Sequence, residues 1–236
     1  MEAVNVEQST LNKNSRLVAR SSRVLLAHMP IRFDHADSPH KHVVETFVAD
    51  RFRHHYQANI TNFLPYLIST ETNEYITAAI GFKPADSLHA LFLEQYLTSS
   101  IEAEISRLTN QVVDRHKIAE VGNLTSIHRG TSQLLFVLTI AILHQAGFEW
   151  SVFTATKQVQ HLLARLNLVT ITVCEANPDN LIDGKQSWGR YYDDRPNVLI
   201  GNLTDAITLL KQHDVIGFIL KNYQKTIVNI AKKMTR

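Results

Sequence analysis

Glu120 points most directly to chemistry, because it interrupts the apolar, strand-like stretch "HKIAEVGNL". Side chains of a strand alternate between the two faces of a sheet, so Glu120 is expected to share a face with Ile118 and Gly122. A carboxylate rarely lies on such a face unless it is partnered or takes part in a reaction. Glu120 is therefore a candidate catalytic residue. The alternative is a structural hydrogen bond to a neighbouring loop.

The backbone just after Glu120 is a second candidate. Gly122 and Asn123 favour a β-bulge, which would turn the N–H groups of the strand, as far as Leu124, toward a carbonyl group of a ligand. Ordinary turn formation accounts for the same residues equally well.

The start of the strongly apolar helix "GTSQLLFVLTIAILHQAG" is a third candidate. Backbone N–H groups and the helix dipole make a helix N-terminus favourable for a phosphate group. The residues placed there are Arg129, Gly130, Thr131 and Ser132. An ordinary helix start, with Thr131 or Ser132 as the N-cap, is the alternative.

Three aromatic side chains lie close together in the stretch "WGRYYDDRPNVLIGNL". We expect this stretch to be a strand, which would place Tyr191 and Tyr192 on opposite faces, so that at most one of them reaches a site. Trp188 is a candidate for contact with a substrate. Core packing with the polar tips satisfied is the alternative for all three.

Glu94 and Glu102 lie on two adjacent short helical segments. Paired carboxylates near a cleft could hold the amine of a substrate. A solvated helix face is the commoner explanation for such residues.

Apolar spacing and turn residues predict strands alternating with helices, with one early hairpin. This order indicates a mixed α/β sheet with helices on both faces. Strands are expected near residues 23–33, 62–70, 74–84, 116–124, 149–156, 169–176 and 188–203, and the longer helices near 42–57, 130–147 and 157–167.

Composition excludes several classes of protein. The 236 residues have a net charge of only +2 with scattered Lys and Arg, which gives no indication of nucleic-acid binding. The single cysteine, Cys174, excludes an internal disulfide and fits a reducing compartment. His40, His42, His54 and His55 show no metal-ligand spacing, so no metal site is expected.

No segment indicates export or a membrane span. The N-terminal stretch lacks the apolar core of a secretory signal, and the longest apolar run, residues 134–143, is about half of what a bilayer span needs. We expect a cytoplasmic protein, with secretion by another route left open.

The order of elements resembles the Gcn5-related N-acetyltransferase fold. More specifically, the chain resembles the bacterial thermostable hemolysin family, itself similar to that fold and to acyl-homoserine-lactone synthases. The resemblance covers residues 45 to 205 and is carried by these strings: "YQANITNFLPYL", "AAIGFKPA", "LFLEQYL", "EVGNL", "FTAT" and "WGRYYDDRPNV".

This resemblance implies a mostly antiparallel acyltransferase-like domain at residues 21–203, preceded by a flexible arm at 1–20. It implies a gap between the strand of Glu120 and its neighbour, where an acyl thioester binds through its pantetheine amides. Glu120 would be the base that takes a proton from an amine acceptor. Tyr191 or Tyr192 would donate a proton to the leaving thiolate.

The resemblance also bears on the donor. Where the acetyltransferase signature reads Gln/Arg-x-x-Gly-x-Gly/Ala, this chain from Arg129 reads Arg-Gly-Thr-Ser-Gln-Leu, with Ser132 and Leu134 in the places of glycine and a small residue. A larger side chain crowds the backbone approach of a pyrophosphate. The acyl-homoserine-lactone synthases lack the signature and use acyl-carrier protein, so the donor is expected to be an acyl-carrier-protein or coenzyme A thioester.

The C-terminal segment, residues 204–236, supports a second hypothesis. From Val215 to Met234 apolar residues recur at helical spacing, with lysines on the opposite side. Such a basic amphipathic helix can lie on an anionic membrane, as expected of a lytic toxin. A helix packed on a sheet has the same pattern. The apolar positions are Ile216, Ile219, Tyr223, Ile227 and Ile230.

Overall fold

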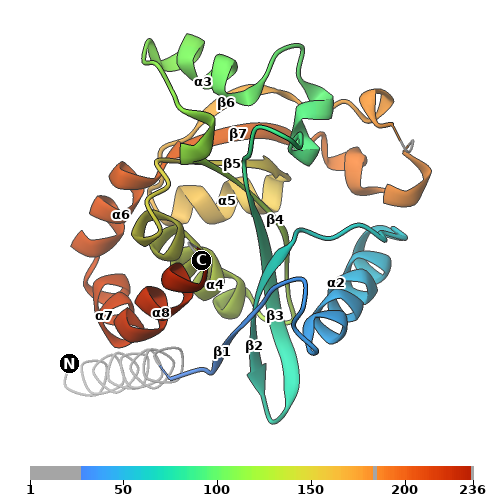
Figure 1. Cartoon of the computed structure of the whole chain (residues 1–236). Coiled ribbons are helices and arrows are strands. Elements are labelled where there is room, and N and C mark those ends of the chain that lie inside the picture. Colours follow the sequence, from blue (N-terminus) through green and yellow to red (C-terminus); the bar gives the residue numbers. More distant parts are fainter. Residues whose placement is uncertain (1–27, 183–184, 235–236) are drawn as a thin grey trace, which may run out of the picture.

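The computed structural model describes residues 28–182 and 185–234, and for Arg129 the backbone alone. The predicted arm at residues 1–20 and the first part of the predicted strand at 23–33 lie outside the described residues. Figure 1 shows one twisted sheet with helices on both of its faces.

Seven strands form the sheet in the order β1-β2-β3-β4-β5-β7-β6. Only the pair β4–β5 is parallel, and all other neighbours are antiparallel. The predicted mixed, mostly antiparallel sheet is therefore confirmed. The strands are β1 (Ile31–Asp34), β2 (Tyr66–Thr72), β3 (Tyr75–Pro84), β4 (Ile118–Ser126), β5 (Trp150–Ala155), β6 (Ile171–Glu175) and β7 (Asn197–Asn202).

Helix α2 lies on one face of the sheet, and α4 lies on the other under α6 and α8 (Figure 1). The helices are α2 (Lys41–Tyr56), α3 (Ile101–Thr109), α4 (Arg129–Gln145), α5 (Lys157–Arg165), α6 (Leu203–Gln212), α7 (Asp214–Asn222) and α8 (Gln224–Met234). Short 3₁₀ helices are η1 (Phe92–Tyr96), η2 (Arg115–Lys117), η3 (Pro178–Asn180), η4 (Gln186–Trp188) and η5 (Tyr191–Asp194).

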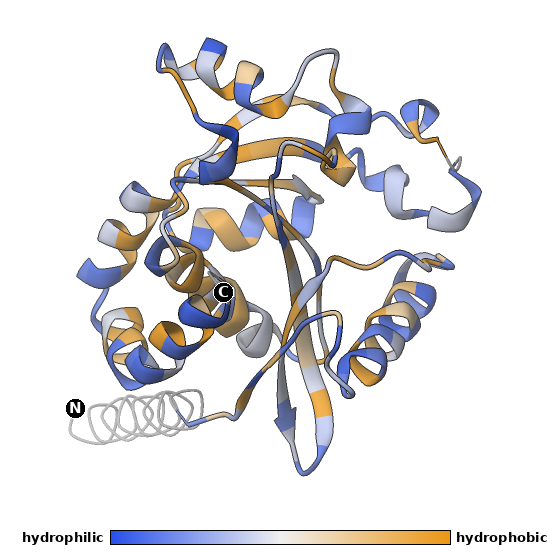
Figure 2. Cartoon of the chain, in the orientation of Figure 1, coloured by the Kyte–Doolittle hydropathy of each residue, from blue (hydrophilic) through white to orange (hydrophobic). Residues whose placement is uncertain are grey.

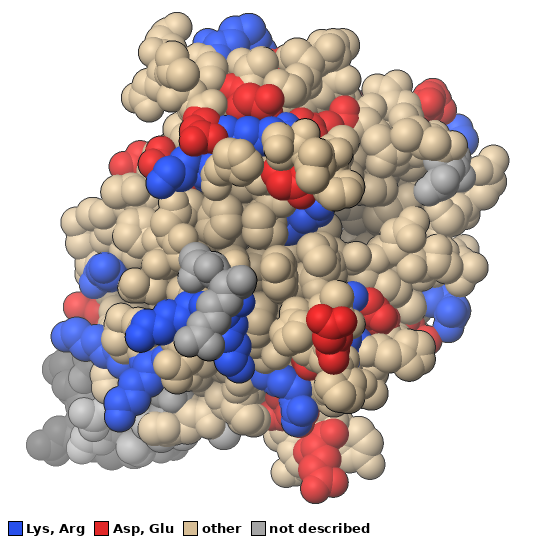
Figure 3. All heavy atoms as spheres, viewed as in Figure 1, with Lys and Arg blue, Asp and Glu red and all other residues tan. Residues whose placement is uncertain are grey.

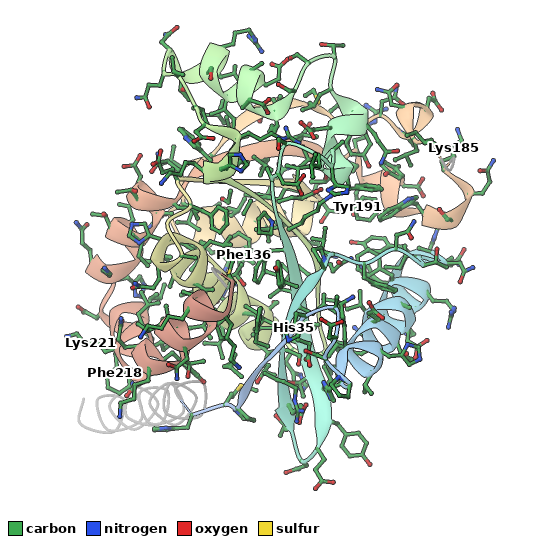
Figure 4. The ribbon with its side chains drawn as sticks, in the orientation of Figure 1. His35, Phe136, Lys185, Tyr191, Phe218 and Lys221 are labelled. Carbon is green, nitrogen blue, oxygen red and sulfur yellow. The ribbon has the colours of Figure 1, made fainter. Side chains whose placement is uncertain are left out.

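The largest core lies around α4. This helix is buried along its length from Leu134 to Leu143, as its uniformly apolar sequence predicts. Its apolar residues belong to one cluster with residues of the sheet and of the C-terminal helices, and Figure 2 shows the hydrophobic colouring of these elements where they meet. One of these apolar residues, Phe136, packs edge-on against Phe153 of β5 and lies near the middle of the molecule in Figure 4.

The C-terminal segment differs from the single helix expected over Val215–Met234. It forms two helices, α7 and α8, with Tyr223 between them. All five residues of the predicted apolar stripe are buried in the core around α4. The segment therefore packs on the domain, and its apolar side is covered. Its lysines are on the outer side, where Figure 3 shows Lys and Arg gathered over α7 and α8.

No helix within residues 28–182 and 185–234 has the length and hydropathy of a membrane span.

The stretch "WGRYYDDRPNVLIGNL" is a strand only from Asn197 onward. Its first half forms η4 and η5, so the argument that alternation separates Tyr191 and Tyr192 is wrong. The physical reason is local. Pro196 has no N–H to donate to a ladder, and Arg195 before it adopts a left-handed conformation (φ 45°), which ends the 3₁₀ turn.

Candidate functional site

The parallel pairing of β4 and β5 covers only three residues on each strand. It ends where Glu120 pairs with Val152, although β4 continues to Ser126 and β5 to Ala155. The two strands therefore separate after Glu120, and within the described part of the chain residues 121–126 of β4 pair with no strand on that side. We call this region the splay and the position of Glu120 its vertex.

A β-bulge interrupts β4 within the splay. Asn123 and Leu124 together face the single residue Ile80 of β3. Asn123 has a φ of 52°, and its Oδ1 accepts a hydrogen bond of 2.9 Å from the N–H of Leu64. The sequence predicts a bulge at Gly122 and Asn123; it is present one residue later, at Asn123 and Leu124, while Gly122 pairs with Gly81. Its role toward a carbonyl stays a prediction.

The bulge changes which residues of β4 face the unpaired side. Before it, the carbonyl of Ile118 points to the β3 side, where it accepts a hydrogen bond from Ala85. After it, the N–H of Ile127 points to the same side and donates to Thr77. Strict alternation would point residues 118 and 127 in opposite directions, so the extra residue reverses the phase.

Glu120 is buried at the vertex, and both of its carboxylate oxygens are occupied. Oε2 accepts a hydrogen bond from the N–H of Phe92 (2.8 Å), and Oε1 accepts one from the N–H of Leu93 (3.0 Å). Burial raises the pKa of Glu120 to about 7, although these two hydrogen bonds and the charge of Lys83 act to lower it. Glu120 therefore makes the structural hydrogen bonds to a neighbouring segment that were the alternative to a catalytic role. Its raised pKa also means that the carboxyl group can gain or lose a proton near neutral pH.

Two tyrosines lie on the same side of the sheet near Glu120. The hydroxyl of Tyr192, from η5, forms a hydrogen bond with that of Tyr96, from η1. Burial raises the pKa of both phenols, that of Tyr192 to about 12, and the negative charge of Glu120 contributes to the rise at Tyr96. Both hydroxyls therefore remain protonated across the physiological range.

Trp188 packs between helix α2 and the short helices η1 and η5 on this face of the sheet. Its ring contacts Phe52 of α2, Phe92 of η1, and both Tyr191 and Tyr192. Tyr191 is buried against α2 and stacks on Phe52, and Figure 4 shows it between α2 and the upper part of the sheet. Tyr191 is therefore a packing residue, and Tyr192 is the tyrosine that is linked to the vertex, through its hydrogen bond with Tyr96.

Glu94 and Glu102 belong to an ion cluster around Arg115. The guanidinium donates to both oxygens of Glu94 and to Oε2 of Glu102, each at 2.7 Å, and to the carbonyl of Asp86 at 2.6 Å. Burial acts to raise the pKa of Glu94, but the hydrogen bonds from Arg115, Ile101 and Leu91 outweigh it, and the pKa is lowered. A surface hollow of about 620 Å³ is lined in part by these charged side chains.

The start of α4 lies at the far end of β4. His128 is the N-cap residue, and the hydroxyl of Thr131 donates to its carbonyl, so neither Thr131 nor Ser132 is the cap. Gly130 is the second residue of the helix. The side chain of Arg129 lies outside the described part of the structure.

The structure thus links Glu120 to Trp188 through Phe92 and to Tyr192 through Tyr96. The length of the splay separates Glu120 from the start of α4. Tyr96 and Arg115 were not expected at the site from the sequence. Arg115 has no local signal, because its partners come from η1 and α3. Tyr96 stands two residues after Glu94 in "LFLEQYL", and its aromatic ring beside a candidate acid was a usable signal.

Comparison with known proteins identifies the family. The sequence profile of the family described as thermostable hemolysin matches residues 35–207. The chain belongs to the thermostable hemolysin family. No curated protein matches this thermostable hemolysin in sequence.

Solved structures show the fold that the hemolysin shares. One is a CoA-dependent acyl-homoserine lactone synthase, BjaI, with SAM and isopentyl-CoA: TM-score 0.51, 10% identity, 80% of this chain and 90% of that chain covered. Another is FeeM, an N-acyl amino acid synthase from uncultured soil microbes: TM-score 0.51, 8% identity, 75% and 93% covered. The thermostable hemolysin therefore has the N-acetyltransferase-like fold of acyl-transferring synthases.

Proposed function

We propose that this thermostable hemolysin is an acyltransferase that moves an acyl group from a pantetheine thioester to a small amine acceptor. The observation that carries the proposal is the end of β4–β5 pairing at Glu120. It leaves an edge of backbone N–H and C=O groups along residues 121–126, and the amides of a pantetheine arm can pair with such an edge as an added strand would.

The chemistry proceeds by attack of the amine nitrogen on the thioester carbonyl. A C–N bond forms, the C–S bond breaks, and the acceptor must lose a proton. Glu120 takes this proton, directly or through one water. Its two oxygens each have a lone pair left after the bonds from Phe92 and Leu93. Its pKa of about 7 makes the ionised form available near neutral pH.

Tyr192 stabilises the leaving sulfur by a hydrogen bond. Its pKa of about 12 lies well above that of a thiol, about 8.5, so complete proton transfer from the phenol to a thiolate is unfavourable. The thiolate gains its proton at the end of the reaction from Glu120 or from solvent. Tyr96, bonded to Tyr192, positions the phenol.

The donor is a thioester of acyl-carrier protein or coenzyme A, and the partner is a small-molecule acceptor. Leu134, buried three residues after Thr131 where the acetyltransferase signature has a small residue, favours the carrier protein.

The test is thiol release. The purified protein is mixed with panels of acyl-coenzyme A and acyl-carrier protein and candidate amines, and free thiol is measured with a thiol-reactive dye. We expect release with at least one donor and a loss of at least about a hundredfold in Glu120→Gln, as for removal of a general base. Absence of both thiol release and thermal stabilisation with every donor contradicts the proposal.

A further inference from the structure

Arg51 places a positive charge on the sheet-facing side of α2. It is one turn beyond Val48 and two beyond Val44, both of which are buried against the sheet. A charged side chain at helical spacing with core residues needs a reason. Arg51 is half-buried, whereas Arg53 two positions on is exposed and pairs with Asp50 on the same helix.

The guanidinium of Arg51 reaches the splay. Its Nη2 donates a hydrogen bond of 3.2 Å to the carbonyl of Ser126, the last residue of β4. The N–H of the same peptide group, that of Ile127, points to β3 and donates to Thr77. The C=O and N–H of a trans peptide point in opposite directions, so the Ser126 carbonyl points away from β3, to the unpaired side. Arg51 therefore lies at the open end of the splay, opposite the vertex.

The hydrogen bonding of Arg51 is incomplete. Its Nε is buried and has no hydrogen-bond partner, and no ion pair joins its guanidinium to a carboxylate in the described part of the chain. A buried donor without a partner costs about 1–3 kcal/mol, so an arginine that only ties α2 to β4 is poorly satisfied here. A bound anion would supply the missing acceptor and the missing charge.

The length of the splay identifies the anion. Six residue steps separate Glu120 from Ser126, which is about 20 Å of strand and somewhat less across the bulge. This is comparable to an extended pantetheine arm, from its thioester to its phosphate. With the thioester at the vertex, the phosphate reaches the guanidinium of Arg51.

We propose that Arg51 binds the phosphate of the pantetheine-bearing donor. This inference rests on the proposed function and adds an anchor beyond residues 129–134 at the start of α4, which depart from the acetyltransferase signature. Coenzyme A and carrier protein both contain this phosphate.

The test separates phosphate binding from binding of the arm. Calorimetry measures the affinity of the full-length protein for 4′-phosphopantetheine and for pantetheine, which lacks the phosphate. We expect the wild type to prefer 4′-phosphopantetheine by about tenfold or more, as for a hydrogen bond to a charged group. Arg51→Gln should remove this preference, so that the two probes bind the variant with equal affinity. Arg51→Lys should keep part of it, and the control Arg53→Gln should keep all of it.

The outcomes are distinct. If the wild type binds pantetheine and 4′-phosphopantetheine equally, or if Arg51→Gln keeps the preference in a protein with a native circular-dichroism spectrum, the assignment of Arg51 is wrong and the acyltransferase proposal stands. If the wild type binds neither probe, nor coenzyme A, nor phosphopantetheinylated carrier protein, both fail. The last two probes also decide which source of phosphate binds more tightly.

Discussion

The hydroxyl oxygens of Tyr96 and Tyr192 lie 2.5 Å apart, although 96 positions separate the two residues in the chain. Tyr96 belongs to η1, whose first N–H groups hold Glu120, and Tyr192 belongs to η5, which packs through Trp188 on α2. The vertex of the splay is therefore assembled from three separate segments, each of which depends on the others for its position.

Replacing either tyrosine by Phe tests this coupling. Each single variant leaves the other hydroxyl without its partner, and we expect a loss of about 1–2 kcal/mol in the free energy of unfolding. The double variant Tyr96→Phe/Tyr192→Phe removes both hydroxyl groups. Its loss of unfolding free energy should be smaller than the sum of the two single losses, by about 1 kcal/mol. Urea unfolding of the four proteins measures the cycle. Strict additivity would mean that the hydroxyls do not interact.

The buried carboxyl of Glu120 predicts a pH-dependent stability. Its pKa is about 7 in the folded chain, against an ordinary value of 4.5 for an unperturbed glutamate, so the folded state binds its proton more tightly. Between these values the folded state holds more protons, and stability must fall as pH rises, by a total on the order of 3 kcal/mol. Above about pH 7, Glu120 is ionised in both the folded and the unfolded state, so it causes no further change of stability with pH.

Glu120→Gln removes this dependence. The amide has one oxygen for the N–H groups of Phe92 and Leu93, so the variant is less stable by about 1–3 kcal/mol than the wild type with Glu120 protonated. Urea unfolding at pH 5 and pH 8 compares the two proteins. We expect the wild type to lose more stability than the variant between these values; equal losses would show that Glu120 does not titrate in this range.

Local patterns accounted for much of the fold. The β2–β3 hairpin and the β4–α4 junction follow from apolar periodicity and turn residues, and both are present where expected. Burial of Glu120 also follows, because strand alternation decides its face. Whether its carboxylate meets a solvent-filled site or the N–H groups of Phe92 depends on where η1 packs, which no local pattern reports.

The aromatic segment at residues 188–194 is a second case in which local sequence patterns do not predict the structure. "WGRYYDD" has the composition of a strand, yet Gly189 (φ 53°) and Arg195 (φ 45°) hold it in turns that pack on the end of α2. Tertiary packing overrides β-propensity here, as is common for aromatic residues. Tyr192 could be singled out from its residue type, but its hydrogen-bond partner Tyr96 could not be predicted.

Gly189 provides a test of that packing. A Cβ at this position would lie 2.3 Å from the carbonyl oxygen of Tyr56 and 2.6 Å from Gln57. Gly147 also has a positive φ, 92°, but open space around it. We expect Gly147→Ala to cost about 1 kcal/mol from backbone strain alone and Gly189→Ala to cost about 1–3 kcal/mol more. Equal melting temperatures for the two variants would contradict the close contact with α2.

Arg115 is expected to be important for stability because it holds two carboxylates, those of Glu94 and Glu102. Arg115→Gln leaves Glu94, whose side chain is 11% exposed, without its charged partner, and we expect a loss of about 3 kcal/mol. The control Arg107→Gln removes an ion pair with Glu104, in which the arginine side chain is 65% exposed, and should cost less than about 1 kcal/mol. Similar chemical-denaturation midpoints for both variants would show that the Arg115 cluster adds nothing beyond a surface pair.

Substitutions in the C-terminal helices α7 and α8 distinguish a structural role of this segment from a lytic, membrane-binding role. Ile227 of α8 is 3% exposed in the core around α4, and Phe218 of α7 is 50% exposed on the outer side. If the segment serves only the fold, Ile227→Ala should lose about 2–5 kcal/mol of stability, whereas Phe218→Ala should lose less than about 1 kcal/mol. Thermal unfolding measures both, alongside binding to anionic lipid vesicles. A membrane-binding role for the buried stripe would instead show Ile227→Ala with native stability and weakened vesicle binding, because its apolar face would then be free of the core.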